Sequence, residues 1–134
     1  MLRKHSDLPA DLNELARKIV DAAFKVHKQL GPGLLESTYR LCLVHELKLR
    51  GLQVQQEVSL PVEYEGIKLD AGYRIDILVE NEIILELKTV DSLLAIHQAQ
   101  LLSYLKHSKK KLGFLINFNA VLLKDGIRRI VNTR

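Results

Sequence analysis

Two short apolar runs decide the fold: Gly72-Tyr73-Arg74-Ile75-Asp76-Ile77-Leu78-Val79 and Ile83-Ile84-Leu85-Glu86-Leu87-Lys88. Both are rich in aliphatic and β-branched residues, and a short polar segment separates them, so they predict a β-hairpin. Asp76, Glu86 and Lys88 interrupt the apolar pattern. A charge inside a buried strand costs several kcal/mol unless it is paired or bound to a metal. These three residues therefore mark a candidate site.

Strand geometry decides which of these charges meet. Glu86 and Lys88 are two residues apart, so they point to the same face of the strand, roughly 7 Å from each other. A two-residue turn would turn Asp76 away from Glu86, whereas a three-residue loop or a β-bulge would bring both carboxylates to one face. A cation site shared by the two carboxylates requires the odd loop or the bulge.

Length and composition indicate one ordinary globular domain. The chain has 134 residues, 47% of them hydrophobic and 27% charged, which predicts a single domain over residues 1–134. No apolar run approaches the roughly 20 residues of a membrane span, and residues 1–7 lack the apolar core of a signal peptide. We therefore expect a cytoplasmic protein without membrane contact. The single cysteine, Cys42, excludes an internal disulfide and a multi-cysteine metal site, and its apolar neighbours indicate a buried small residue.

Basic residues outnumber acidic ones, giving a net charge of +4, which suits a polyanionic partner. They gather in two clusters. The first comprises Lys106, His107, Lys109, Lys110 and Lys111, and the second comprises Lys124, Arg128, Arg129 and Arg134. Solvated helix ends are an equally good explanation for such clusters.

Hydrophobic periodicity predicts the element order α-α-β-β-β-α-β-β. The predicted helices cover residues 9–30, 34–50 and 91–106, and the predicted strands cover residues 54–64, 67–79, 83–88, 111–118 and 126–131. Pro61 should perturb the first strand, and Gly72 should bend the second. The third helix is expected to be capped by Asp91-Ser92 and to carry a polar stripe of His97, Gln100 and Tyr104. This order favours an α/β fold with a mixed central sheet flanked by helices.

Three short motifs resemble those of a nuclease superfamily. Asp76, followed after nine residues by Glu86-Leu87-Lys88, is similar to the D…(D/E)-x-K signature of the PD-(D/E)XK nuclease superfamily. Residues 33–39, GLLESTY, match the G-x-x-E-x-x-Y motif that names the GxxExxY protein family, assigned to that superfamily. Gln100 and Tyr104 resemble the Q-x-x-x-Y helix motif of RecB-like nucleases. Three motifs in the expected order are much more specific than any one of them.

The resemblance extends from about Asp11 to Val131, and one departure from the family pattern is visible. Ile75 precedes Asp76, at the position of the proline that gives the superfamily its name. The resemblance implies a restriction-endonuclease-like fold. The metal ligands that it implies are Glu36, Asp76, Glu86 and the carbonyl of Leu87. It assigns to Lys88 the holding or activation of the attacking water. The substrate contacts that we expect are Tyr39, Arg74, Gln100 and Tyr104.

The chemistry of the residues supports the same kind of site. Carboxylates without histidine or cysteine favour Mg²⁺ or Mn²⁺ over zinc. Such an ion can bridge a scissile phosphate and its water, and the ammonium of Lys88 could stabilise the resulting anion. Each part also has a simpler explanation. Glu86 and Lys88 could form a buried salt bridge, and Glu36 could complement a helix dipole. Tyr39 could be a core residue, and Gln100 and Tyr104 could be ordinary surface residues.

These patterns predict a metal-dependent nuclease that hydrolyses phosphodiester bonds of DNA rather than RNA, with a homodimer as a possible assembly on a duplex. The alternative is a non-catalytic module that keeps the nuclease fold and binds nucleic acid or a protein partner. The chain has only four tyrosines and three phenylalanines, so the sequence predicts neither an aromatic stacking surface nor base-specific readout.

Overall fold

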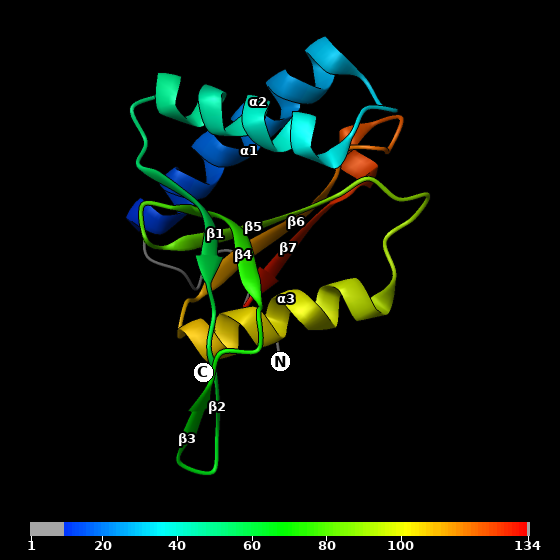
Figure 1. Cartoon of the computed structure of the whole chain (residues 1–134). Coiled ribbons are helices and arrows are strands. Elements are labelled where there is room, and N and C mark those ends of the chain that lie inside the picture. Colours follow the sequence, from blue (N-terminus) through cyan, green and yellow to red (C-terminus); the bar gives the residue numbers. More distant parts are fainter. Residues whose placement is uncertain (1–9, 134) are drawn as a thin grey trace.

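The computed structural model describes residues 10–133, so the expected helix start at Pro9 and the basic residue Arg134 lie outside the described residues. The described chain forms three layers (Figure 1). Helices α1 (Ala10–Leu30) and α2 (Glu36–Leu49) cover one face of a central sheet, and helix α3 (Ala95–Ser108) covers the other. None of these helices combines the length and the hydropathy needed to span a membrane.

The central sheet has five strands and is mixed. Their order is β1 (Val54–Ser59), β4 (Arg74–Val79), β5 (Ile83–Lys88), β6 (Leu112–Asn117) and β7 (Ile127–Val131). Strands β5 and β6 are parallel because α3 forms the crossover between them, and the other neighbours are antiparallel. A short 3₁₀-helix, η2 (Leu123–Asp125), precedes β7. The mixed sheet flanked by three helices confirms the predicted fold class.

Two of the predicted strands are each broken in two. The segment 54–64 is divided between β1 and β2 (Val62–Tyr64), and the segment 67–79 is divided between β3 (Ile67–Leu69) and β4. The first break falls at Leu60-Pro61, since proline has no N–H for the ladder. The second contains Gly72, whose φ of +84° suits glycine. Strands β2 and β3 form a separate ribbon that projects from the body (Figure 1).

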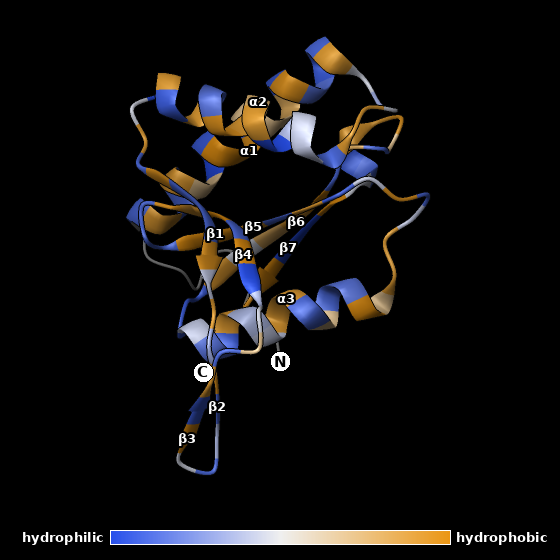
Figure 2. Ribbon diagram, in the orientation of Figure 1, coloured by the Kyte–Doolittle hydropathy of each residue, from blue (hydrophilic) through white to orange (hydrophobic). Residues whose placement is uncertain are grey.

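The core lies on both sides of the sheet. Small and branched residues of α1, such as Ile19, Ala22 and Ala23, are fully buried against α2 and the strands. Figure 2 shows apolar residues along the central strands and on the helices that cover them. His27 lies at the edge of this core, where its Nε2 is 2.7 Å from the carbonyl of Ala120.

Two helices begin later in the chain than predicted. Helix α2 starts at Glu36 rather than at residue 34, so Glu36 is its first residue. Helix α3 starts at Ala95 rather than at 91–92, and the expected cap by Asp91-Ser92 is wrong. The N–H of Leu94, the residue before α3, instead donates to Nδ1 of His97 at 3.0 Å. This bond satisfies a terminal N–H from within the helix, as the third residue of a capping box does.

Candidate active site

The hairpin of β4 and β5 places Asp76 opposite Glu86. Its register pairs Ile77 with Leu85 across a loop of three residues, 80–82. Continued by one step, the same register sets Asp76 against Glu86, and opposite residues of an antiparallel pair share a face. The odd loop length that a shared carboxylate site requires is therefore confirmed.

Side chains replace the backbone ladder at this point. The N–H of Asp76 donates to Oε1 of Glu86 at 3.1 Å, and the N–H of Leu87 donates to Oδ2 of Asp76 at 2.9 Å. Each carboxylate thus accepts a hydrogen bond from the opposite strand, which fixes both side chains. One oxygen of each carboxylate is not used in this exchange.

Strand β4 changes face at Asp76. Ile77 packs in the core beneath α1 and α2, but Ile75, two residues away, packs in the core beneath α3. The neighbouring strand β1 is irregular at the same level, because Glu57 has a φ of +49°. The sequence predicted a bend at Gly72, whereas this break in alternation falls at the site itself.

Burial makes Glu86 an unusual carboxyl group. Its residue is only 5% exposed. Desolvation, followed by the neighbouring charge of Asp76, raises the pKa of Glu86 to about 9, and the ammonium of Lys88 opposes this only in part. Without a cation, Glu86 therefore stays protonated at neutral pH. The simpler alternative, a salt bridge between Glu86 and Lys88, is not among the ion pairs within residues 10–133.

Glu36 approaches the same site from helix α2. Desolvation and then the charge of Asp76 raise the pKa of Glu36, while Lys88 and Arg40 oppose the rise. The Glu36 carboxyl is thus within electrostatic range of both Asp76 and Lys88. As the first residue of α2, Glu36 also lies at the positive end of the helix dipole.

Tyr39 has a structural place rather than the predicted substrate contact. It is fully buried, and its ring stacks on Phe118 with centroids 4.7 Å apart. Its hydroxyl donates to the carbonyl of Gly31 and accepts from the N–H of Leu34 at 3.1 Å. A side chain enclosed in this way cannot touch a substrate. It fixes the turn that leads into Glu36.

The end of β5 is fixed from the neighbouring strand, and this positions Lys88. The carbonyl of Lys88 accepts from the N–H of Phe118 at 3.0 Å. Asn117, which is 2% exposed, accepts from the N–H of Val90 at 3.1 Å and donates to its carbonyl at 2.9 Å. The backbone on either side of the Lys88 side chain is thereby held.

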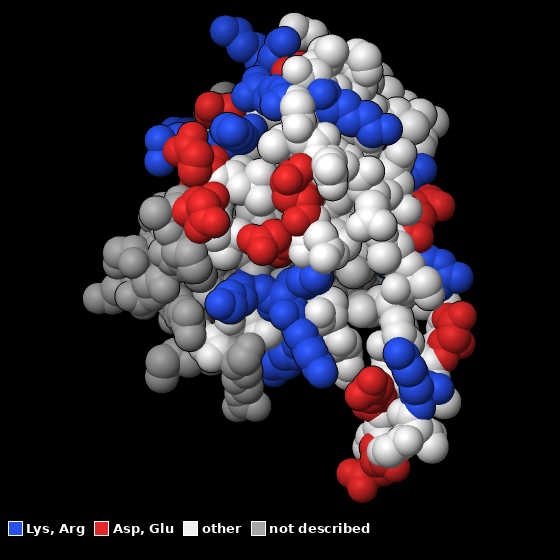
Figure 3. Space-filling model, turned by 90° about the vertical axis from the view of Figure 1, so that its left-hand side faces the viewer, with Lys and Arg blue, Asp and Glu red and all other residues white. Residues whose placement is uncertain are grey.

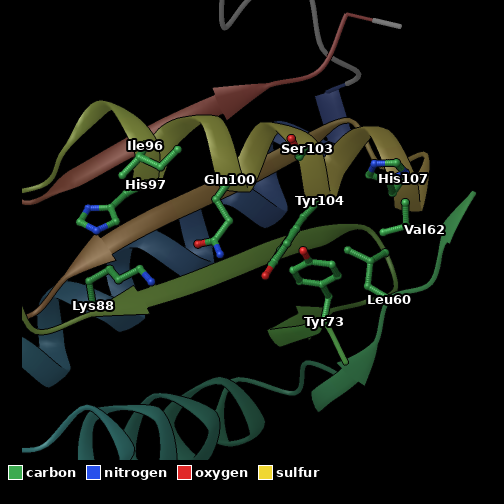
Figure 4. A pocket seen from close by; sticks show the side chains of 10 residues that line it. All are labelled: Leu60, Val62, Tyr73, Lys88, Ile96, His97, Gln100, Ser103, Tyr104 and His107. Atoms are coloured by element: carbon green, nitrogen blue, oxygen red, sulfur yellow. The ribbon is translucent and has the colours of Figure 1, made fainter. Parts of the chain in front are cut away.

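The predicted polar stripe of α3 lines a cleft together with Lys88. The cleft has a volume of about 550 Å³. Its wall consists of Leu60, Val62, Tyr73, Lys88, Ile96, His97, Gln100, Ser103, Tyr104 and His107. Figure 4 shows Gln100 and Tyr104 extending from α3 toward β5, with Lys88 at one end and Tyr73 beside Tyr104. Desolvation and then the charges of Glu86 and Asp76 raise the pKa of Tyr104, so its hydroxyl lies near both carboxylates.

The donor set fits a hard divalent cation in part. Within residues 10–133, no three Asp, Glu, His or Cys side chains gather closely enough to form a metal cluster. The interlocked pair of Asp76 and Glu86 does supply two carboxylates without nitrogen or sulfur, and Mg²⁺ is often bound by one or two carboxylates and several waters. A cation bound here would also favour the ionised form of the buried Glu86 over the protonated form. Two carboxylates with the Leu87 carbonyl, and Glu36 farther out, are the ligands that these residues could offer.

The expected basic surface is more mixed than the sequence suggested. Lys109, Lys110 and Lys111 surround a shallow pocket of about 310 Å³ together with Asp11 and Glu82. Figure 3 shows a face on which acidic side chains lie between groups of lysine and arginine. This cluster lies at the start of β6, which pairs with the start of β5, so it is about 17 Å along the strand from Lys88.

Arg128 and Arg129, the two arginines of the second cluster among the described residues, are engaged within the protein. Arg129 lies 5.8 Å from the ring centre of Phe114 and donates to Asn13. Arg128 donates to the carbonyls of Asp125 and Ile127, both at 3.0 Å. Arg74, a predicted substrate contact, is half-exposed at the start of β4; it donates to the Tyr73 carbonyl and pairs with Asp70 at 3.7 Å.

The sequence missed the wall of the cleft that faces α3. Leu60, Val62 and Tyr73 reach it from segments before β4. The break of the two long strands, which creates this wall, was signalled only by Pro61 and Gly72.

Comparison with known proteins supports the resemblance seen in the sequence. A family model described as "PD-(D/E)XK nuclease superfamily" matches residues 13–130. The matched range contains the Asp76–Glu86 pair, Lys88 and the whole cleft. Neither the curated proteins nor the solved structures gave a match.

Proposed function

The chain belongs to the PD-(D/E)XK nuclease superfamily, and we propose from this premise that it hydrolyses phosphodiester bonds of DNA with the help of Mg²⁺ or Mn²⁺. The observation that carries the proposal is the interlocked carboxylate pair of Asp76 and Glu86. Lys88, two residues after Glu86 on β5, lies at one end of a cleft that is also lined by Gln100 and Tyr104 (Figure 4). Membership supports nuclease chemistry in general, and the polymer, the metal and the residue roles are our proposal.

Asp76, Glu86 and the Leu87 carbonyl would hold the cation, with Glu36 nearby. When bound, the cation supplies Lewis-acid activation of water and stabilises negative charge on the phosphate oxygens. The hydrogen bonds from the opposite strand keep Asp76 and Glu86 in place before any ligand arrives. Such preorganisation avoids a cost at the moment of reaction.

Lys88 would orient the attacking water and stabilise the charge that develops on the phosphate. Its carbonyl is bonded to the N–H of Phe118, so the ammonium extends into the cleft from a fixed backbone. Gln100 and Tyr104 offer an amide and a hydroxyl on the opposite wall, where they could steady the strand that is cut.

A cleavage assay tests this function. Labelled single-stranded, duplex and branched DNA, and RNA of the same sequence, are incubated with the protein and Mg²⁺, Mn²⁺ or EDTA. We expect metal-dependent cleavage of DNA that Asp76→Asn or Lys88→Ala reduces at least about 100-fold. Matched controls are Asp21→Asn and Lys48→Ala, two exposed residues of α1 and α2, which should leave the rate unchanged.

Two outcomes would contradict the proposal. Cleavage that persists unchanged in Asp76→Asn would point to a contaminating nuclease. Salt-sensitive DNA binding without cleavage, indifferent to Glu86→Gln, would favour the alternative of a non-catalytic binding module. Cleavage confined to RNA would support the proposed phosphodiester hydrolysis but contradict DNA as the substrate.

A further inference from the structure

The projecting ribbon of β2 and β3 is amphipathic. Its register pairs Val62 with Leu69 and Tyr64 with Ile67, so these four side chains share one face. The charged pair between them occupies the other face. We call the first of these the apolar face of the ribbon.

The apolar face is open to solvent. Tyr64 is 67% exposed, Ile67 54% and Leu69 45%. An isolated two-stranded ribbon is only marginally stable in water, and contiguous exposed apolar groups on a soluble protein usually mark a contact surface. The exposed apolar face therefore has the character of a contact surface.

The apolar face continues into the cleft of the candidate active site. Val62 belongs to both, and Figure 4 shows it beside Leu60 on the same wall as Tyr73. The Tyr73 ring meets the Tyr104 ring edge to face, with centroids 6.1 Å apart. A track of apolar and aromatic groups thus leads from the cleft that Lys88 lines, past Tyr104 and Tyr73, to Val62 and Tyr64 of the ribbon. Three of the chain's four tyrosines lie along it, although the sequence predicted no stacking surface.

The charges of the ribbon argue against phosphate as the group that it contacts. The ribbon and its turn carry Glu63 and Glu65 against a single lysine, Lys68. Phosphate groups bind where cations gather, whereas the flat faces of bases pack on aromatic and aliphatic side chains. The apolar face thus suits the bases of a nucleic acid. Cations elsewhere in the protein, such as Lys88 and Arg74, suit its phosphate backbone.

We propose that the apolar face of the ribbon and the Tyr73 wall bind unpaired bases of a nucleic-acid strand whose backbone reaches the carboxylate pair. The substrate class is then a single strand, or a single-stranded end or flap, rather than intact duplex, because paired bases keep their faces stacked inside the helix. This inference rests on the proposed function and specifies the strand state on which it acts.

Binding without cleavage tests the inference. The Asp76→Asn protein is titrated in EDTA into fluorescein-labelled oligo(dT), into an abasic deoxyribose-phosphate chain of equal length and charge, and into a duplex. We expect oligo(dT) to bind about tenfold tighter than the abasic chain or more, which is the size of one or two base-stacking contacts. Tyr64→Ala and Tyr73→Ala should each lower this ratio several-fold and leave abasic binding unchanged. Lys68→Ala, on the opposite face of the ribbon, is the matched control and should keep the ratio.

Equal binding of oligo(dT) and the abasic chain would overturn the inference, as would a ratio that Tyr64→Ala leaves intact. A dimer in solution that Ile67→Glu converts to a monomer, without any change in the ratio, would also overturn it and assign the ribbon to self-association. The result is independent of catalysis. Base-dependent binding in a protein that never cleaves would contradict the proposed nuclease activity alone, whereas cleavage without base-dependent binding would contradict the ribbon proposal alone.

Discussion

The hydroxyl of Tyr39 holds the turn before α2. Its removal should lower both the stability of the protein and the activity of the candidate active site. Tyr39→Phe keeps the ring stacked on Phe118 but leaves the Gly31 carbonyl and the Leu34 N–H without this partner. We expect a loss of about 1–2 kcal/mol in the free energy of unfolding, measured by urea denaturation. Cleavage should fall as well, since Glu36 loses its fixed approach.

Tyr64→Phe is the control for this change, because Tyr64 is exposed and lies on the ribbon. It should leave the free energy of unfolding unchanged. Equal stability of Tyr39→Phe and the parent protein would contradict the structural role given to the buried hydroxyl.

The buried carboxyl of Glu86 predicts an unusual pH dependence. Its pKa of about 9 in the folded protein lies above the ordinary value of 4.5 that applies when the chain unfolds. Between these values the folded state holds a proton that the unfolded state has released, so the free energy of unfolding of the metal-free protein should fall as pH rises through this window. Urea denaturation in EDTA across the window measures the slope. Glu86→Gln should flatten it, and an unchanged slope in that variant would show that another group is responsible.

The charged residues of the candidate site were easier to predict from the sequence than the residues that surround them. Asp76, Glu86 and Lys88 were found because an ionised group in a strand needs a physical explanation. For Tyr39 the sequence left a substrate contact and a core position open, because a tyrosine in a motif looks the same whether its ring faces a cleft or a core; the structure buries the side chain. How closely Glu36 approaches Asp76 and Glu86 could not be predicted, because no pattern in the sequence gives the distance from the start of α2 to the hairpin; within residues 10–133 no three such side chains form a metal cluster.

Helix α3 lies close to the sheet at Gly113, where Leu101 packs against the strand. A Cβ on Gly113 of β6 would come within 3.0 Å of Leu101 and 3.1 Å of the Ile84 carbonyl. Gly113→Ala should push α3 outward and lower the free energy of unfolding by about 1–3 kcal/mol. Urea denaturation measures this, and oligonucleotide binding should weaken because Gln100 and Tyr104 move with the helix.

Leu101→Ala, tested alone and together with Gly113→Ala, shows whether the crowding is real. If Leu101 is the obstacle, the two substitutions should cost less together than the sum of their separate effects. Strict additivity would mean that the Ile84 carbonyl alone resists the added methyl group.

The loop that joins β5 to α3 depends on Asn117. Asn117→Ala removes both bonds to Val90 and the bond from the Asn119 N–H. We expect a loss of about 1–3 kcal/mol in the free energy of unfolding, because buried backbone groups lose their partner, together with a lower kcat from the looser placement of Lys88. Asn119→Ala, which removes one bond of 3.5 Å, should have a smaller effect on both measurements. The reverse order would contradict this account.

At the level of elements, the order of helices and strands was predictable from periodicity, and the ends of the elements were not. The start of α3 was misplaced because Asp91-Ser92 has the chemistry of a cap, while the bond that forms comes from His97, inside the helix. The projecting ribbon was hidden within two apparently continuous strands. Its separation depends on tertiary placement of the chain around Pro61 and Gly72, which local patterns indicate only weakly.

For the molecule as a whole, binding of a cation should appear as added stability. Mn²⁺ that binds the folded protein and not the unfolded chain stabilises it by about 2.7 kcal/mol at 100 times its Kd. We expect Mn²⁺ to raise Tm in a thermal unfolding series and EDTA to reverse the rise. Asp76→Asn and Glu86→Gln should abolish the shift, and Asp21→Asn should keep it. A Tm that Mn²⁺ raises equally in all of them would place the ion elsewhere.

The connector of three residues between β4 and β5 has a consequence for how related chains can diverge. Deleting or inserting one residue there would reverse the phase of one strand against the other and carry Asp76 out of reach of Glu86, even if both residues were retained. Gains or losses of two residues would preserve the phase. Related chains are thus free to vary the residues of that connector. Its length can change only by an even number of residues if the two carboxylates are to stay on the same face of the sheet.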